Sequence, residues 1–182
     1  MIELAHHLLD IGENSLQAGA KTLLIEVKEE RKEGFLILEI TDDGRGMTQE
    51  EQVKALDPFY TTKKVRKVGL GLPMLFQAAE RTGGRLELKS TPGKGTKVTV
   101  HMGLHHIDRQ PLGDVGGAIA ALILGNPEVR IIYRHNNGAE TFEMDTEQIK
   151  KELDGLPLNH PEVLNFIRDF INTQVREMSP EA

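Results

Sequence analysis

The chain has 182 residues, no cysteine and a net charge of −6 at pH 7. This length fits one domain, or one domain with a substantial appendage. The acidic balance argues against a general affinity for nucleic acid, which needs a cationic surface, and the lack of cysteine excludes disulfides and thiol chemistry.

Membrane insertion and secretion are not expected either. No apolar run approaches the roughly 20 residues of a membrane-spanning helix. The first residues, Met-Ile-Glu-Leu-Ala-His-His, lack the basic start and apolar core of a signal peptide. We therefore expect a cytoplasmic protein that does not bind membranes.

The first half of the chain is predicted to begin with a helix and to continue with strands and further helices. Apolar residues recur at helical spacing between Leu4 and Ala18, and Gly19 is well placed to end that helix. Thr48 and Glu51 have the spacing of a capping box at the start of a short helix. The other expected elements are, in chain order, strand 22–27, strand 35–40, helix 70–81, strand 85–91 and strand 96–102.

The second half, after Gly103, is predicted to add a smaller set of elements. Asn136-Asn-Gly138 is a strong turn signal between two strands, and Thr146 is expected to cap the helix that follows them. The expected elements are helix 112–124, strands 129–134 and 141–144, helix 146–153 and helix 161–175. The apolar helix could bury against the sheet or form a homodimer contact.

These elements predict an α+β fold, a two-layer α/β sandwich with a mixed sheet and helices on one face. We expect two units, residues 1–103 and a small C-terminal α+β extension over 104–182. No linker rich in Gly, Ser or Pro separates them, so the extension should pack on the first unit.

The most informative segment is 57–72, Asp-Pro-Phe-Tyr-Thr-Thr-Lys-Lys-Val-Arg-Lys-Val-Gly-Leu-Gly-Leu. Its cations and hydroxyls, together with the backbone N–H groups of the helix that follows, are suited to cradling a polyphosphate. The basic cluster at positions 63–67 could alternatively contact DNA, which the overall acidity disfavours. Two glycine boxes flank this segment, Asp42-Asp-Gly-Arg-Gly46 and Pro92-Gly-Lys-Gly-Thr96.

The first predicted helix carries a further pair of polar residues. Asp10 and Asn14 are four residues apart and therefore share one helix face. A carboxylate beside an amide oxygen is a reasonable set of ligands for Mg²⁺, which prefers oxygen and keeps several waters.

These four blocks, in this order, resemble the ATP-binding domain of the GHKL superfamily over roughly residues 1–103. That superfamily includes type II topoisomerases, mismatch-repair ATPases, heat-shock chaperones and histidine kinases. Residues 13–20 are most similar to the mismatch-repair version, whereas 57–72 and 90–100 are most similar to bacterial histidine kinases. The resemblance implies the Bergerat ATP-binding fold and the ligands ATP and Mg²⁺.

The resemblance also implies roles for individual residues. Asn14 would ligate Mg²⁺, and Asp42 would accept the exocyclic amine of adenine, with Asp43 as the alternative if the register differs by one. Lys63 and Lys64 would neutralise the β- and γ-phosphates. The other expected nucleotide contacts are Gly44, Gly46, Met47, Thr61, Thr62, Gly69, Leu70, Gly71, Leu72 and Thr96.

One position departs from the family pattern. Asp10 stands where the ATPases usually have the glutamate that activates the attacking water. Aspartate is shorter by one methylene, about 1.5 Å of reach, and a general base must come within about 3 Å of the proton that it takes. Nucleotide binding should survive this change, whereas hydrolysis depends on whether Asp10 still reaches the water.

Three functions remain open from the sequence. The motifs favour a protein kinase. Such a kinase would need its phosphoacceptor on a separate polypeptide, because no acceptor-histidine hairpin precedes the first motif. A non-catalytic module would recruit a regulatory partner when ATP binds. A weak ATPase would resemble the mismatch-repair proteins and would require dimerisation.

Overall fold

The structure, a computed structural model, describes residues 3–57 and 71–179. Its elements follow in the order α1 (Leu4–Gln17), β1 (Thr22–Glu30), β2 (Phe35–Asp42), α2 (Gln49–Ala55), α3 (Gly71–Arg81), β3 (Arg85–Thr91), β4 (Gly95–Gly103), α4 (Val115–Gly125), β5 (Arg130–Asn136), β6 (Thr141–Asp145), α5 (Thr146–Glu152) and α6 (Pro161–Met178).

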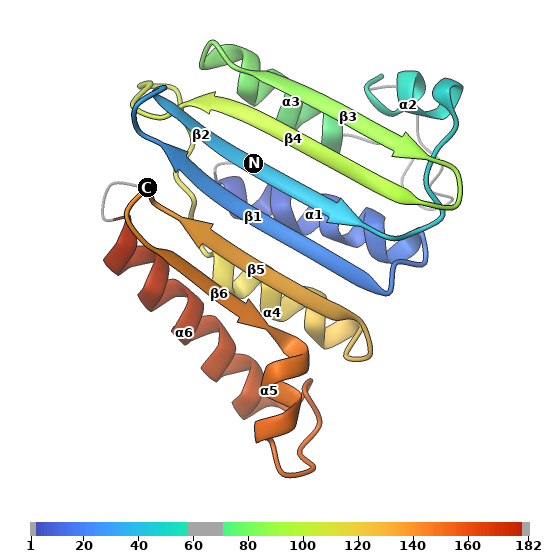
Figure 1. Ribbon diagram of the computed structural model, residues 1–182, viewed down its shortest axis with the longest axis vertical. Helices are drawn as coiled ribbons and strands as arrows, with labels where there is room; N and C mark the ends of the chain where they lie inside the picture. The colour runs from blue at the N-terminus through green and yellow to red at the C-terminus, as the bar shows by residue number, and fades with distance from the viewer. Residues whose placement is uncertain (1–2, 58–70, 180–182) are drawn as a thin grey trace.

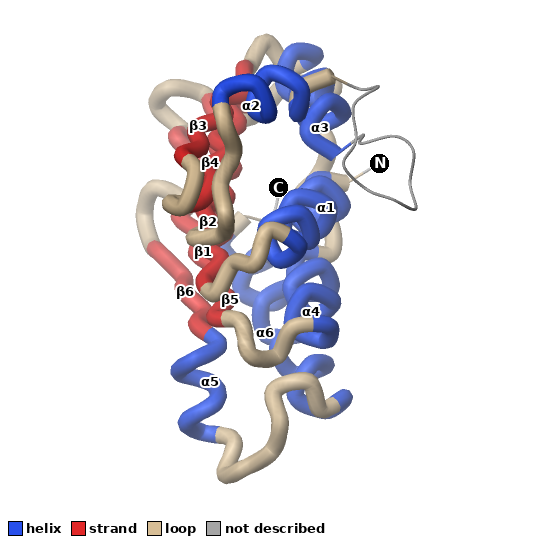
Figure 2. The backbone as a smooth tube through the Cα atoms, turned by 90° about the vertical axis from the view of Figure 1, so that its right-hand side faces the viewer, coloured by secondary structure: helices blue, strands red, loops and turns tan. Residues whose placement is uncertain are grey.

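The strands of the described ranges form one mixed sheet in the order β3-β4-β2-β1-β5-β6 (Figure 1). Neighbouring strands are antiparallel except β1 and β5, which are parallel. Helices α1, α3, α4 and α6 lie on one side of the sheet (Figure 2). The predicted α+β fold, a two-layer sandwich with helices on one face of a mixed sheet, is confirmed.

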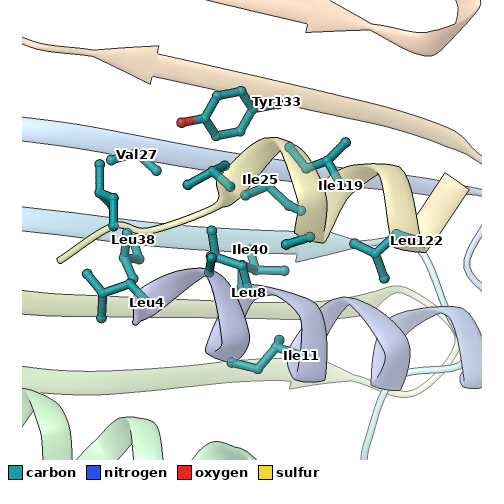
Figure 3. Close-up of a cluster of buried hydrophobic side chains, with 14 of the residues drawn as sticks. Leu4, Leu8, Ile11, Ile25, Val27, Leu38, Ile40, Ile119, Leu122 and Tyr133 are labelled. Carbon is teal, nitrogen blue, oxygen red and sulfur yellow. The ribbon is translucent and has the colours of Figure 1, made fainter. Parts of the chain in front are cut away.

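The hydrophobic core fills the space between the sheet and the helix layer. Side chains from α1, β1, β2, α4 and β5 meet there (Figure 3). Leu8, Ile25, Ile40, Ile119 and Tyr133 are each at most 2% exposed. Burying a side chain of this size contributes about 1.5 to 3 kcal/mol. Because these residues come from both halves of the chain, the two halves share one core.

The opposite face of the sheet is charged and carries ion pairs. Arg134 of β5 lies 2.7 Å from Glu26 of β1 and 2.6 Å from Glu143 of β6. Lys97 of β4 lies 2.7 Å from Glu39 of β2. Successive side chains of a strand alternate between the two faces. This alternation therefore explains why the helices gather on one side only.

The second half of the chain also completes the start of α1. The first N–H groups of a helix have no partner within it, and the N-cap residue Glu3 provides no side-chain cap. The N–H groups of Leu4 and Ala5 instead donate to the carbonyl oxygens of Pro111 and Leu112, both at 2.9 Å. The segment before α4 thus acts as the N-terminal cap of the first helix.

The predicted capping box of α2 is confirmed, since Thr48 and Glu51 bond to one another's backbone N–H groups. The predicted cap of α5 was wrong. Asp145 caps this helix by accepting from the N–H of Glu147 at 2.9 Å, while the hydroxyl of Thr146 is buried and accepts from the N–H of Ile131 at 2.9 Å. Thr146 is therefore the first residue inside the helix, and Asp145, one position earlier, is its N-cap.

Helix α4 begins at Val115, later than the expected residue 112. Asp114 caps it, with Oδ1 accepting from the N–H of Gly117 at 2.8 Å. The residues of its expected first turn are not helical: Gly113 has φ +73°, and the carbonyl oxygen of Leu112 accepts from the N–H of Ala5 in α1. The choice left open for this helix is resolved in favour of burial, since Ile119, Leu122 and Ile123 are at most 2% exposed.

We expect Gly116→Ala to destabilise the fold by about 1 to 3 kcal/mol, because it overpacks the contact between α4 and α6. A Cβ at this position would lie 2.2 Å from the carbonyl oxygen of Arg168. Gly125→Ala is the matched control, since a Cβ there meets no atom within 4 Å. That variant should be neutral or stabilised by up to about 1 kcal/mol. Urea unfolding would measure both, and equal effects would contradict the close helix packing.

Over residues 3–57 and 71–179, no helix combines the length and apolar character that crossing a bilayer requires.

Candidate functional site

The predicted metal and phosphate residues come together where α1 meets the start of α3. A Cβ added to Gly71 would lie 3.6 Å from Oδ2 of Asp10 and 3.9 Å from Nδ2 of Asn14. Both side chains therefore face the first turn of α3. The N-terminus of a helix carries a partial positive charge and free N–H groups, so this junction can hold a phosphate beside a carboxylate and an amide.

Asp42, the last residue of β2, is held in one orientation by three hydrogen bonds. Its Oδ1 accepts from the N–H groups of Gly44 at 2.9 Å and Thr96 at 3.2 Å. Its Oδ2 accepts from the hydroxyl of Ser15 at 2.7 Å. Asp42 as a whole is only 8% exposed. A carboxylate has about four acceptor positions, so one position on Oδ2 stays available to an amine donor.

Asp43, the alternative for the adenine contact, has a different environment. Its Oδ1 accepts from the backbone N–H groups of Lys21 at 2.7 Å and Thr22 at 2.9 Å. Slight burial would raise its pKa, but these backbone hydrogen bonds outweigh that effect and lower it. Asp43 is exposed and fixes the connection between α1 and β1. The structure therefore favours Asp42 for recognition of a base.

Two glycines allow the loop after β2 to approach the β3–β4 hairpin. Gly46 has φ +67° and Gly95 has φ +98°, a region that L side chains rarely adopt. A Cβ on Gly46 would lie 2.0 Å from the carbonyl oxygen of Thr91, and one on Gly95 would lie 1.9 Å from that of Asp42. Only glycine fits at either position.

Ser90 of β3 joins several parts of this region. Its hydroxyl accepts from the N–H of Met47 at 2.8 Å and lies 2.9 Å from the hydroxyl of Thr96. Its backbone N–H and carbonyl bond to the side-chain amide of Gln52 at 3.2 and 3.0 Å. Helix α2, which buries none of its own side chains, is thereby attached to the hairpin beside Asp42.

Ser15, Gln52 and Ser90 were not among the predicted site residues. Ser15 had a detectable signal, because it is a polar residue within the apolar stripe of the first helix, and buried polar groups are normally hydrogen-bonded. Ser90 and Gln52 had no such signal. These two residues lie 38 positions apart in the sequence and bond to one another only in the folded chain.

The remaining predicted residues divide into two groups. Leu72 is partly buried, and its side chain packs against the hydrophobic core. Six others lie outside the described residues: Thr61, Thr62, Lys63, Lys64, Gly69 and Leu70.

Two surface hollows can be compared with the predicted site. One, of about 370 Å³, is lined by Asp42, Thr96, Gln52 and Ser90 at the end of the β3–β4 hairpin. The other, of about 440 Å³, lies between α1, α4 and α6 and contains none of the predicted nucleotide residues. Pockets for small ligands have about 300 to 1,000 Å³. The first hollow contains Asp42 and Thr96, whereas Asp10, Asn14 and Gly71 do not line it.

Mg²⁺ fits the residues present at the junction of α1 and α3. Within residues 3–57 and 71–179, no group of three His, Cys, Asp or Glu side chains gathers as a self-sufficient metal site. Mg²⁺ commonly takes one or two protein oxygens and completes its shell with substrate phosphates and water. Asn14 and Asp10 match that requirement beside the N-terminus of α3.

We expect Ser15→Ala to weaken ATP binding about tenfold, since a hydrogen bond to a charged group contributes about 1.5 to 3 kcal/mol. The hydroxyl of Ser15 donates to Oδ2 of Asp42 at 2.7 Å and so orients this oxygen. Gln17→Ala, at an exposed position on the same helix, is the control and should leave the affinity unchanged. Calorimetric titration would compare the two variants, and equal affinities would contradict this role.

Residues 2–106 match the family described as histidine kinase-, DNA gyrase B- and HSP90-like ATPases. The chain is 29% identical over 94 residues to Sporulation kinase C of Bacillus subtilis (strain 168), covering 52% of this chain and 22% of that protein. It is 27% identical over 110 residues to the sensor histidine kinase ZraS of Escherichia coli (strain K12), covering 60% and 23%. It is 36% identical over 69 residues to the sensor kinase CckA of Brucella abortus (strain 2308), covering 37% and 7%. Each match spans less than a quarter of the relative's own length.

Proposed function

Because this chain belongs to the histidine kinase-, DNA gyrase B- and HSP90-like ATPase family, we propose that it binds Mg²⁺-ATP and transfers the γ-phosphate to a separate protein. The predicted family and its similarity to bacterial sensor histidine kinases are confirmed. The observation that carries the proposal is the anchored carboxylate of Asp42, which keeps one acceptor position available for the amine of adenine.

The proposed roles follow from position and chemistry. Asp42 accepts the exocyclic amine of adenine, which guanine lacks at that position. The first turn of α3, beginning at Gly71, binds phosphate through its N–H groups. Asn14 supplies an oxygen to Mg²⁺ beside it, and Lys63 and Lys64 neutralise the phosphate charge. Bound Mg²⁺ would stabilise the negative charge that develops on the phosphate oxygens.

Transfer to a protein acceptor fits Asp10 better than hydrolysis does. In the transfer step the acceptor forms a bond to the γ-phosphorus, and ADP leaves with the bridging oxygen. Asp10 then takes the acceptor's proton. A side chain about 1.5 Å shorter than glutamate positions a small water poorly, whereas a docked acceptor can bring its own group into reach.

The second candidate is a non-catalytic module in which ATP binding controls recruitment of a partner. The shorter carboxylate of Asp10 also supports this function, because it leaves nucleotide binding intact while slowing chemistry. A weak ATPase is a third possibility that the family suggests. Slow turnover in the absence of a partner is compatible with all three functions, so the decisive readout is the destination of the γ-phosphate.

Two measurements test the proposal. Calorimetric titration with ATP, ADP and GTP in the presence of Mg²⁺ should give binding of the two adenine nucleotides and none of GTP. Incubation with γ-labelled ATP and cellular protein should then transfer label to a partner, and Asp10→Asn should abolish that transfer without preventing ATP binding. Adenine binding without any labelled protein would favour the recruitment module, and absence of adenine binding would remove all three functions.

A further inference from the structure

Helix α6 presents two exposed aromatic rings to solvent. Phe166 is 61% and Phe170 is 40% exposed, and their rings stack with centroids 5.7 Å apart and planes at 8°. Phe142 of β6 contacts Phe170 edge-on at 5.3 Å. We call these three residues the α6 aromatic face. They lie on the rim of the sheet, where β6 is the edge strand.

The fold does not need the outer two rings. The opposite side of α6 already anchors the helix through Val163, Ile167 and Ile171, which are at most 6% exposed. Monomeric proteins rarely leave contiguous large apolar groups in water unless they bind something there. Rigid aromatic side chains are also enriched among the residues that dominate binding energy at protein interfaces.

Carboxylates share this side of the helix. Glu162 precedes Phe166 by four positions, Asp169 follows it by three, and Glu177 follows Phe170 by seven; all three are exposed. Within the described part of the chain, none of these three carboxylates belongs to an ion pair. The exposed Arg176 lies seven positions after Asp169, on the same side of the helix, so the three carboxylates leave a net negative charge around the rings.

The same bias extends over the second half of the sequence. Residues 1–110 contain 16 Lys and Arg against 16 Asp and Glu, whereas residues 111–182 contain 6 against 12. The whole net charge of −6 therefore belongs to the part of the chain that carries the α6 aromatic face. A field of this sign attracts cationic partners and repels anionic ones.

We propose that the α6 aromatic face is a docking surface for a cationic segment of a partner protein. Aliphatic side chains of that segment would cover the stacked rings, and its Arg or Lys groups would pair with Glu162, Asp169 and Glu177. A second copy of this chain fits poorly, because the three carboxylates of one copy would lie against the same three carboxylates of the other and repel them. An anionic membrane surface fits poorly for the same reason.

The docking surface is distant from the nucleotide residues. Helix α6 lies beside β6 at one edge of the sheet, and α2 and α3 lie towards the opposite edge (Figure 1). A partner held there leaves the site around Asp42 uncovered. The inference thus goes beyond the proposed function and does not depend on it, since docking requires no nucleotide.

Two helical peptides of about 14 residues, long enough to form a helix on a surface, provide the test. One carries leucines at every third or fourth position and arginine or lysine elsewhere, and the other has glutamate in place of each cation. Fluorescence anisotropy without nucleotide, at low and high salt, would compare their binding to the full chain. We expect the cationic peptide to bind about tenfold tighter than the acidic one and to weaken as salt rises.

Three variants make the result specific. Phe166→Ser combined with Phe170→Ser should weaken binding of the cationic peptide about tenfold, and Glu162→Gln with Asp169→Asn and Glu177→Gln should weaken it and flatten its salt dependence. Leu124→Ser, which changes a residue of α4 that is 57% exposed, should leave binding unchanged. Thermal unfolding would confirm that each variant is folded.

Three results of the peptide experiment would overturn the proposal. These are equal binding of the two peptides, no binding of the cationic peptide, or wild-type binding of the cationic peptide by the double Phe variant. Sedimentation that reveals a dimer dispersed by the Phe changes would assign the face to a second copy and would also overturn it. Since no nucleotide is present, each of these results leaves the proposed ATP site untouched.

Discussion

Replacing Asp42 with Asn is expected to weaken ATP binding by about 100-fold, the scale seen when one partner of a buried, charged hydrogen bond is removed. The amide oxygen of Asn can keep the two N–H donors now bound to Oδ1, from Gly44 and Thr96. Its NH₂ group would then replace Oδ2, which faces Ser15. A donor in that position opposes the exocyclic amine of adenine instead of accepting from it.

The same argument predicts a change in base preference. An NH₂ group at this position can donate to the O6 carbonyl of guanine, so the preference for ATP over GTP should fall along with the affinity. Asp43→Asn is the matched control, because that carboxylate binds backbone N–H groups of the α1–β1 connection. Calorimetry with both nucleotides measures the effect. Loss of ATP binding in Asp43→Asn but not in Asp42→Asn would transfer the adenine contact to Asp43.

The second large effect concerns stability at acid pH and depends on Glu29 of β1. This side chain is buried and accepts hydrogen bonds from Ser179 and from Arg31 at 2.9 Å, and its Oε1 lies 3.3 Å from Nε2 of His135. Tyr133 extends the network, with its hydroxyl 3.0 Å from Nδ1 of His135. The network joins β1 and β5 to the end of α6, so it links the two halves of the chain.

Burial alone would raise the pKa of Glu29, but the hydrogen bonds from His135, Ser179 and Arg31 outweigh it and lower the pKa from 4.5 to about 2. Such a difference between the unfolded and folded chain corresponds to a stabilisation on the order of 3 kcal/mol. Because the folded pKa is the lower one, this stabilisation is fully present above pH 4.5. It should be lost as the pH falls from 4.5 towards 2.

Urea unfolding between pH 7 and pH 2.5 would measure this effect. Glu29→Gln should be less stable than the wild type by on the order of 3 kcal/mol at pH 7. Its free energy of unfolding should also fall much less between pH 4.5 and pH 2.5 than that of the wild type. Glu30→Gln, at the neighbouring exposed position, should retain the stability of the wild type at pH 7 and its loss of stability at acid pH. If the two variants show the same acid dependence, the loss of stability arises from general charge repulsion and not from this network.

Local sequence signals predicted most of the elements. The apolar spacing from Leu4 to Ala18 predicted α1, and the turn Asn136-Asn-Gly138 predicted the β5–β6 hairpin. The capping box at Thr48 was also correct. Such signals act over a few neighbouring residues, so the chain carries them before it folds. Errors occurred where two local signals competed, as with Asp145 and Thr146.

The candidate site was predictable to a similar depth. Asp10 and Asn14 were singled out by their spacing and Asp42 by the resemblance to the GHKL superfamily, and the described structure brings the first two beside Gly71. The network that orients the carboxylate of Asp42 was not predicted. Ser15 reaches it across 27 positions and Thr96 across 54, and no local pattern specifies such distances.

The sequence by itself therefore determined the types of element, their order and the motifs that imply a nucleotide site. Tertiary structure decided the parallel pairing of β1 with β5, the capping of α1 by the carbonyl oxygens of Pro111 and Leu112, and the Glu29 network. The physical reason is the range of the interactions. Periodicity and capping are fixed between near neighbours, whereas strand partners more than 100 positions apart are selected only when the whole core is packed.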